Sequence, residues 1–404
     1  MPINEFPQNM ITLALWIACS TALSCTTTDL TTPIAKAGTN VVQPVTAATP
    51  TPTSEAITIA AVGDVMLGSP FPNESRMPPN DGADILKNVT PILSAADIAF
   101  GNMEAPITDG GISDKCPPPK PDPPSTGPPK QLSPPSTGPP KQPEPIRCFA
   151  FRMPTRFAKN LKAAGFDVMS VANNHASDFG DAGRANTRKT LDALGIKHAG
   201  SDRTQFSTTY LDVRGTKVAF IGFAHNNIVP NVNDLDSARR LVQDAGKKAD
   251  IVVVSFHGGA EGIGAQHVPR QTELFLGEKR GNLPLFARTV IDAGADLVLG
   301  HGPHVLRGME IYKDRLIAYS LGNFATYGWF KLTGETALTI ILEARLDAGG
   351  KFLGGKIHSA RQEGWGIPVL DNTGAAVKKI RSLSHTDFAT SAPNIDDEGS
   401  ISIK

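Results

Sequence analysis

Two histidines, His301 and His304, follow the short apolar run at residues 297–299 of this 404-residue sequence. Gly300 ends the run, and Gly302 with Pro303 favours a tight turn between the two imidazoles. A buried strand that stops at a glycine and leads into two imidazoles is suited to presenting metal ligands. We therefore predict that His301 and His304 bind a metal ion.

Four other short apolar runs, at residues 57–62, 97–100, 167–172 and 251–256, also lead into polar side chains. The polar residues that follow them are Asp64, Glu104, Asn174 with His175, and His257. Helical patterns at residues 83–93, 155–164, 182–194 and 283–293 separate several of the runs, which is typical of parallel βαβ units. Since ligands bind beyond the carboxyl ends of parallel strands, we expect these polar residues to converge on one site.

The expected site combines carboxylate oxygen, amide oxygen and imidazole nitrogen. Its predicted metal ligands are Asp64, Glu104, Asn174, His257, His301 and His304. Such a set suits Mn, Fe or Zn, as one ion or as a pair, because it contains no cysteine to favour a soft metal. A pair could share a bridging carboxylate, either Glu104 or Asp64. His175 is the predicted catalytic residue, which would donate a proton to a leaving group.

The N-terminal part of the sequence predicts export. Residues 10–24 form an apolar segment of signal-peptide length, and Ala22-Leu23-Ser24-Cys25 resembles a lipoprotein cleavage box. We expect a signal or lipoprotein-like segment at residues 1–25, with Cys25 as the lipid site. An uncleaved membrane anchor is the alternative, because no Lys or Arg precedes Lys36. Residues 26–55, dominated by Thr, Ala and Pro, predict a linker.

One large α/β domain is predicted at residues 56–382, interrupted by a proline-rich insertion at residues 116–148. Cys116 and Cys148 border the insertion, which suggests a disulfide in an exported protein; two free thiols are the alternative. Strand patterns at residues 305–311, 316–320, 337–342 and 355–360 lack intervening helices and indicate antiparallel pairing in a second sheet. Residues 383–404 are polar and predict a loose tail.

Charge and composition restrict the class of partner. The sequence has 39 basic and 39 acidic side chains, so its formal net charge is zero. This balance gives no electrostatic reason to expect binding to nucleic acid.

The ordered polar stretches carry a family resemblance. They are Gly63-Asp64-Val65-Met66-Leu67-Gly68, Gly101-Asn102-Met103-Glu104, Ala172-Asn173-Asn174-His175, His257-Gly258, Gly300-His301-Gly302-Pro303-His304 and Ser320-Leu321-Gly322-Asn323-Phe324. This set resembles the CapA family of capsule-synthesis or poly-γ-glutamate biosynthesis proteins, within the calcineurin-like metallophosphoesterase superfamily. The cysteine pair followed by Phe149-Ala150-Phe151-Arg152 resembles a subgroup of that family. The resemblance implies a four-layer α/β/β/α sandwich of two mixed sheets.

Three positions depart from the superfamily pattern. Met66 stands where the first motif has a histidine, Asn102 and Glu104 occupy the neighbourhood of the usual bridging aspartate, and Ala176 follows His175 where an acidic residue would orient the imidazole. One metal ion is therefore an alternative to two.

Four polar residues near the motifs are candidates for substrate binding: Asn102, Arg280, Arg307 and Asn323. The two arginines could bind a phosphate or another polyanion.

The resemblance implies an envelope-associated, metal-dependent hydrolase or transferase in capsule or poly-γ-glutamate metabolism, acting through a metal-bound hydroxide. Expected partners are an anionic extracellular polymer or phosphoester substrate, capsule synthesis machinery, and the membrane through an N-terminal lipid or anchor. The alternative is a non-catalytic polymer-handling or assembly subunit. The missing first-motif histidine favours this alternative, whereas the retained histidines favour an enzyme.

Overall fold

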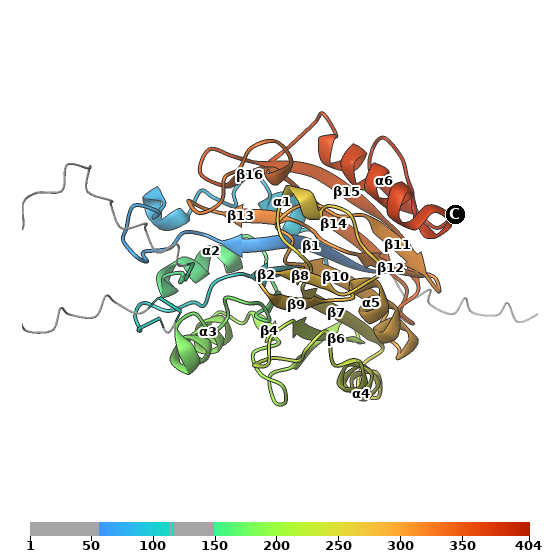
Figure 1. Cartoon of the computed structure of the whole chain (residues 1–404), viewed down its shortest axis with the longest axis horizontal. Helices are drawn as coiled ribbons and strands as arrows, with labels where there is room; N and C mark the ends of the chain where they lie inside the picture. Colours follow the sequence, from blue (N-terminus) through green and yellow to red (C-terminus); the bar gives the residue numbers. More distant parts are fainter. Residues whose placement is uncertain (1–55, 114, 117–148) are drawn as a thin grey trace, which may run out of the picture. The chain divides into compact units, whose positions relative to one another are not determined.

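The computed structural model describes residues 56–113, 115–116 and 149–404. The larger of its two main sheets contains β1 (Ile57–Met66), β2 (Ile98–Met103), β3 (Val168–Ser170), β4 (Lys197–Ala199), β13 (Asn323–Thr326), β14 (Leu338–Leu346), β15 (Phe352–Glu363), β16 (Ile367–Leu370), β17 (Asn394–Ile395) and β18 (Ser400–Ser402). Its strand order is β17-β18-β15-β14-β1-β2-β3-β4, with β13 paired to β1 and β16 to β15 (Figure 1).

The smaller sheet contains β5 (Thr208–Val213), β6 (Thr216–Ala224), β7 (Ile251–His257), β10 (Leu297–His301), β11 (Met309–Tyr312) and β12 (Arg315–Ala318), in the order β11-β12-β10-β7-β6-β5. Strands β6, β7, β10 and β12 are parallel, and β5 and β11 pair antiparallel at the two edges. A separate hairpin is formed by β8 (Glu273–Phe275) and β9 (Glu278–Gly281). Both main sheets are therefore mixed.

The α-helices are α1 (Thr90–Leu93), α2 (Ala158–Ala163), α3 (Gly180–Ala193), α4 (Leu235–Gly246), α5 (Leu283–Asp292) and α6 (Ala375–Phe388). Short 3-10 helices lie at η1 (Pro79–Gly82), η2 (Thr155–Phe157), η3 (Ile263–Ala265), η4 (Gly334–Thr336) and η5 (Ala389–Ser391). Polar side chains cap the N-termini of two helices. Asp234 accepts a hydrogen bond from the Ser237 amide at the start of α4, and Asn282 accepts one from the Leu285 amide at the start of α5.

Three hydrophobic cores separate four layers. The central core lies between the two sheets and includes side chains from β1, β7 and β10. A second core joins the outer face of the larger sheet to α1, α2 and α3, and a third joins the outer face of the smaller sheet to α4 and α5. The predicted α/β/β/α sandwich of two mixed sheets is thus confirmed (Figure 1).

The alternation of side chains along a strand explains why the apolar runs are continuous. In β1, Ile59 and Ala61 belong to the central core, whereas Ala60 and Val62 face the outer helices. Strands that are buried on both faces need apolar residues at every position. The runs that suggested buried strands in the sequence therefore form the middle of the sandwich.

The strands that follow His304 confirm the predicted antiparallel pairing, since β11 pairs antiparallel with β12 and β14 with β15, but they are divided between the two main sheets instead of forming one sheet. Strand β12 lies parallel to β10 in the smaller sheet, whereas β13 lies parallel to β1 in the larger one. The chain crosses between the sheets at Leu321, which bridges to Leu306. The helix expected at residues 83–93 is also shorter than predicted, because turns precede α1.

The prediction of a loose tail at residues 383–404 is wrong. Helix α6 continues to Phe388, and β17 and β18 extend the larger sheet beside β15. Ile395 and Ile401 are buried in the central core, so two isolated apolar residues are enough to hold these short strands. Each strand is too short to leave a recognisable period in the sequence.

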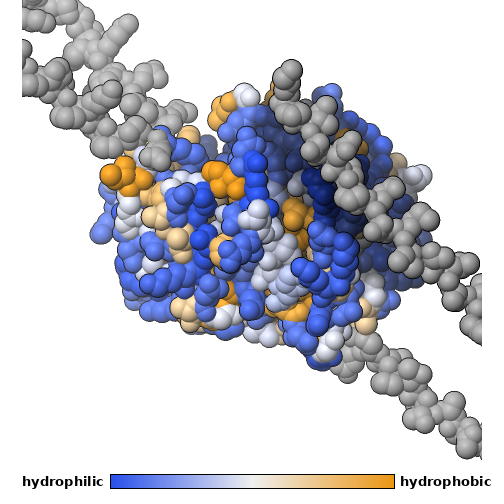
Figure 2. All heavy atoms as spheres, turned by 90° about the horizontal axis from the view of Figure 1, so that it is seen from below, coloured by the Kyte–Doolittle hydropathy of each residue, from blue (hydrophilic) through white to orange (hydrophobic). Residues whose placement is uncertain are grey.

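The predicted signal segment at residues 1–25 and the linker at residues 26–55 lie outside the described residues. So does Cys148, and the Cys116–Cys148 disulfide stays a prediction. Within the described ranges, no helix combines the length and the apolar character needed to cross a membrane. The face of the molecule in Figure 2 is mostly hydrophilic, with apolar residues in small scattered groups.

Candidate metal centre

Two buried carboxylates from neighbouring strands form the base of the site. Asp64 lies near the end of β1 and Glu104 follows β2, and neither side chain has any exposed surface. Asn102 pairs in register with Asp64, and its Nδ2 donates to Asp64 Oδ1 and to Glu104 Oε2, at 2.8 Å each. The amide of Asn102 therefore separates two acidic groups that would otherwise repel each other.

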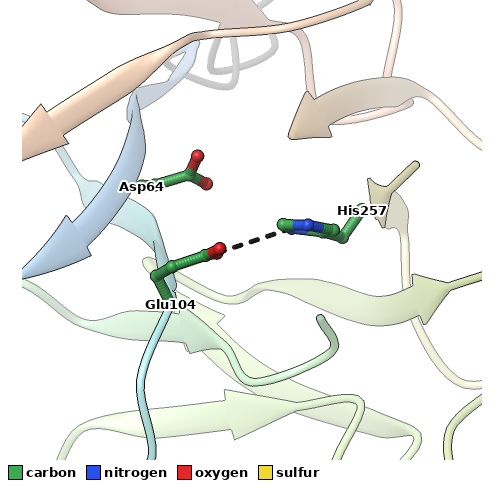
Figure 3. Close-up of side chains that lie close together, drawn as sticks. All are labelled: Asp64, Glu104 and His257. Carbon is green, nitrogen blue, oxygen red and sulfur yellow. Dashed lines mark ion pairs between the residues drawn. The ribbon is translucent and has the colours of Figure 1, made fainter. Parts of the chain in front are cut away.

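Two imidazoles face these carboxylates from the smaller sheet. His257 and His301 pair in register at the ends of β7 and β10, and both are fully buried. His257 Nδ1 lies 3.6 Å from Glu104 Oε2, and His301 Nδ1 lies 3.6 Å from Asp64 Oδ1. Figure 3 shows the ring of His257 directed at Glu104 from the opposite side of the site. These separations are too long for hydrogen bonds.

His304 approaches the carboxylates from a strained turn. Its φ angle is 58°, in the left-handed region, and Gly302 packs so close to Gly258 that a Cβ at Gly302 would lie 2.6 Å from the Gly258 carbonyl oxygen. Its Nδ1 lies 2.9 Å from both Asp64 Oδ2 and Asn323 Oδ1, so Nδ1 carries the hydrogen. Nε2 then faces Glu104 Oε1 at 3.8 Å.

Unpaired buried atoms show that this donor set fits a cation. Both ring nitrogens of His257 and of His301, together with Glu104 Oε1, are buried without a hydrogen-bond partner among the described residues. Leaving a buried polar atom unpaired costs about 1–3 kcal/mol. One oxygen of Asp64, one of Glu104 and one nitrogen of His257 lie within 4.8 Å of one another. Carboxylate and imidazole ligands suit a divalent transition metal.

The pKa shifts follow from burial and from the facing charges. Burial favours a higher pKa for Asp64, but the imidazoles of His301 and His304 outweigh it and hold that pKa well below its ordinary value. Burial and the Asp64 charge raise the pKa of Glu104 well above its ordinary value. Burial disfavours the charged form of His304, yet the carboxylates, Asp64 first, raise its pKa to about 10. A metal ion must therefore displace protons to bind at neutral pH.

His175 lies beside this group and is oriented by a carboxylate. His175 Nδ1 is 2.7 Å from Asp178 Oδ2, and the amide of His175 donates to Asn173 Oδ1 at 2.9 Å. Asn173 in turn donates to Asn102 Oδ1 at 3.3 Å, which links His175 to the carboxylate pair. Burial lowers the pKa of His175, against the opposing effect of Asp178. The acidic partner that the sequence lacked at Ala176 is therefore supplied by Asp178, three residues after the histidine.

Two of the residues predicted to bind substrate, Asn102 and Asn323, lie in the centre. They contact predicted metal ligands: Asn102 donates to Asp64 and Glu104, and Asn323 accepts from His304. Asn174 Oδ1 is buried without a hydrogen-bond partner among the described residues, and the Asn174 carbonyl oxygen accepts from Lys115. Five of the six predicted ligands meet in one place, and the ligand role of Asn174 stays a prediction.

Arg280 and Arg307 correct the expectation of substrate binding. Arg307 is completely buried, and its guanidinium donates to both carboxylate oxygens of Glu273, at 2.8 and 2.7 Å. Arg280 is 2% exposed and forms ion pairs with Glu261 and Glu278. Both guanidiniums are buried and pair with glutamates of the same chain, and Nε of Arg280 has no hydrogen-bond partner among the described residues.

Two residues beside the centre, His225 and Glu261, were not predicted from the sequence. His225 directly follows β6, and its Nδ1 lies 3.4 Å from the carbonyl oxygen of His257. Its position directly after the apolar run at residues 218–224 was the signal that could have identified it. Glu261 Oε2 lies 4.0 Å from His304 Nε2. It belongs to a loop after β7, where no pattern marks it.

Fold and donor set together define an α/β/β/α sandwich protein with a buried candidate metal centre. The family model described as "Bacterial capsule synthesis protein PGA_cap" matches residues 58–124 and 135–327. The chain is 28% identical over 304 residues to the capsule biosynthesis protein CapA of Bacillus anthracis, a match that covers 70% of this chain and 63% of that protein. It is 30% identical over 301 residues to the PGA biosynthesis protein CapA of Bacillus subtilis, covering 70% and 67%. The chain belongs to this bacterial capsule synthesis protein family.

The chain thus spans about two thirds of the length of these two relatives. Among solved structures, the NAD nucleotidase NadN of Haemophilus influenzae overlaps it with a TM-score of 0.37 at 13% identity, covering 86% of this chain and 58% of that one. The fold is assigned from the layered topology alone.

Metal addition should stabilise the chelator-treated full-length chain, and more strongly at pH 8 than at pH 6, because protons on His304 and Glu104 compete with the ion. At a free Mn²⁺ concentration of 100 times the dissociation constant, mass action gives about 2.7 kcal/mol. Differential scanning fluorimetry measures the shift. His257→Ala should lose most of it, whereas His358→Ala, on β15, should keep it. An equal shift in both variants would contradict the assignment.

Proposed function

We propose that this protein is an envelope-associated, metal-dependent hydrolase or transferase acting on a phosphoester or amide bond in capsule or poly-γ-glutamate metabolism. The observation that carries the proposal is the buried centre, in which carboxylates and unpaired imidazoles face each other from two sheets. The names of the relatives, which refer to capsule and PGA biosynthesis, support the metabolic setting.

The ligand residues have distinct tasks. Asp64, Glu104, His257, His301 and His304 would hold one or two divalent ions, with Mn, Fe or Zn as the candidates. Such ions supply Lewis acidity and lower the pKa of bound water. Asn102 keeps the two carboxylates apart, and Asn323 orients His304 through Nδ1. Asp64, Glu104 and His304 are thus held by hydrogen bonds within the protein before an ion binds.

His175 is the proposed proton donor. Asp178 accepts the hydrogen of Nδ1, so Nε2 on the other side of the ring faces the leaving group and donates to it when the ring is doubly protonated. A row of aromatic rings connects His175 to the centre: Phe151 lies 4.2 Å from the His175 ring, and Phe330 lies 4.8 Å from the His304 ring, measured between centroids. Phe151 and Phe330 are themselves 6.4 Å apart. A substrate that reaches both groups would lie along this aromatic row.

The proposed partners follow from this setting. They are an anionic extracellular polymer or phosphoester as substrate, capsule synthesis machinery, and the membrane, reached through an N-terminal lipid or anchor. Nucleic acid is not among them, because the net charge is zero.

Substitution of His175 provides the test of catalysis. In His175→Ala, turnover of phosphodiester and γ-glutamyl substrates should fall about 100-fold or more, the range expected for loss of an acid catalyst. Metal content should stay at the wild-type level, because His175 is not a ligand. His198→Ala serves as the control, since His198 lies on β4, where it pairs with Asp192 and packs against Phe206. Full turnover in His175→Ala would exclude it as the proton donor.

A second candidate function, polymer handling without catalysis, is favoured by a cavity outside the centre. This cavity of about 660 Å³ lies between α2, α3 and the loop at residues 108–111. Arg156, Lys159 and Lys189 are among its lining residues, and all three are exposed. An anionic chain could lie against these cations.

The double variant Lys159→Glu/Lys189→Glu distinguishes the second candidate. If the cavity binds polymer, affinity for poly-γ-glutamate should drop at least tenfold and lose most of its salt dependence, as measured by fluorescence anisotropy. The control Lys248→Glu/Lys351→Glu changes the net charge equally at exposed positions elsewhere. Equal weakening in both variants would show that net charge, not the cavity, governs binding.

A further inference from the structure

The Asp178 carboxylate is held by two chain segments that are distant in sequence. Lys115 Nζ contacts Asp178 Oδ1 at 2.7 Å, and the Phe151 amide donates to Asp178 Oδ2 at 2.8 Å. These two residues flank the proline-rich insertion on either side. The Asp178 side chain itself has no exposed surface. A buried carboxylate is stable only when its oxygens are paired, and here both oxygens receive donors.

We propose that Lys115 and Phe151 are positioning residues for His175: they fix Asp178 from two sides and thereby set which imidazole nitrogen faces the reaction. The proposal rests on the function given above, in which His175 donates a proton. It adds two residues to the working site that lie outside every metal motif.

The geometry around Asp178 determines the tautomer of His175. An ionised carboxylate offers only acceptors, so His175 Nδ1, 2.7 Å from Oδ2, must be the donor. Lys115 supplies a positive charge that compensates the buried carboxylate of Asp178. Its Nζ also donates to the Asn174 carbonyl at 3.0 Å, and so it ties the residue before His175 to the same point.

Phe151 restricts the imidazole from the other side. Its ring lies 4.2 Å from the His175 ring at an interplanar angle of 34°, and it is 3% exposed. Trp329 packs against Phe151 in a T-shaped arrangement at a centroid distance of 4.5 Å. The backbone amide of Phe151 donates to Asp178, and the Phe151 ring packs against His175. One residue therefore positions the carboxylate partner of the imidazole and also restricts the plane of the imidazole ring.

Neutralising Lys115 tests the proposal without altering the metal ligands. In Lys115→Met, His175 should lose its single Nδ1-protonated tautomer, and turnover should fall about 10- to 100-fold, the usual effect of removing such an orienting contact. KM and metal content should stay within twofold of the wild type. Lys115→Arg should restore both the tautomer and most of the rate. Lys162→Met, which removes a cation from the exposed pair with Asp167, is the matched control.

The tautomer is read by long-range ¹H–¹⁵N correlation spectra of the full-length, histidine-labelled protein, with the His175 signals assigned through His175→Gln. Unchanged His175 signals and an unchanged rate in Lys115→Met would overturn the proposal. A changed tautomer without any detectable turnover, even in the wild type, would support the positioning role and contradict the hydrolase function. Loss of folding in Lys115→Met would show in circular dichroism, and Lys115→Gln then replaces it.

Discussion

Two carboxylates, Asp64 and Glu104, lie side by side without exposed surface, and the surrounding side chains compensate for their burial. Burying two acidic groups together is unfavourable unless hydrogen bonds and positive charge compensate. Asn102 provides one donor to each carboxylate, and His304 provides charge. Imidazole nitrogens without partners complete the ring around them. A divalent cation bound here would use one nitrogen of each imidazole and the free carboxylate oxygens.

The packing of the two sheets in the sandwich brings the ligands together. The carboxylates end strands of the larger sheet and the imidazoles end strands of the smaller one, so the centre forms only when both sheets pack together. Close backbone contact permits it: a Cβ at Gly63 would lie 1.9 Å from the Gly322 carbonyl oxygen, and one at Gly300 would lie 2.4 Å from that of Tyr319. Glycine at these two positions lets neighbouring segments approach where the ligands emerge.

Much of this could be predicted from the sequence, because buried strands and their endings leave a clear pattern. Asp64, Glu104, His257, His301 and His304 follow continuous apolar runs, and the structure brings all five together. Two results had no such signal. The pairing of Arg280 and Arg307 with glutamates depends on loop packing. The burial of Ile395 and Ile401 depends on contacts with a distant strand.

The residue that orients His175 also could not be predicted from the sequence. The sequence lacked an acidic residue at position 176, yet Asp178 reaches the imidazole because a turn of the chain brings it back. Lys115 and Phe151 join it from either side of the insertion. Local pattern thus identifies the ligands, whereas tertiary contacts determine how the groups around them are held.

Direct measurement of bound metal tests the central claim most directly. The full-length chain, loaded with Mn²⁺ or Zn²⁺ and freed of excess ion, is analysed by plasma mass spectrometry beside its His301→Ala and Asp64→Asn variants. We expect one or two ions per wild-type chain and a clear loss in both variants. A wild-type chain that retains no stoichiometric metal after loading would contradict the account.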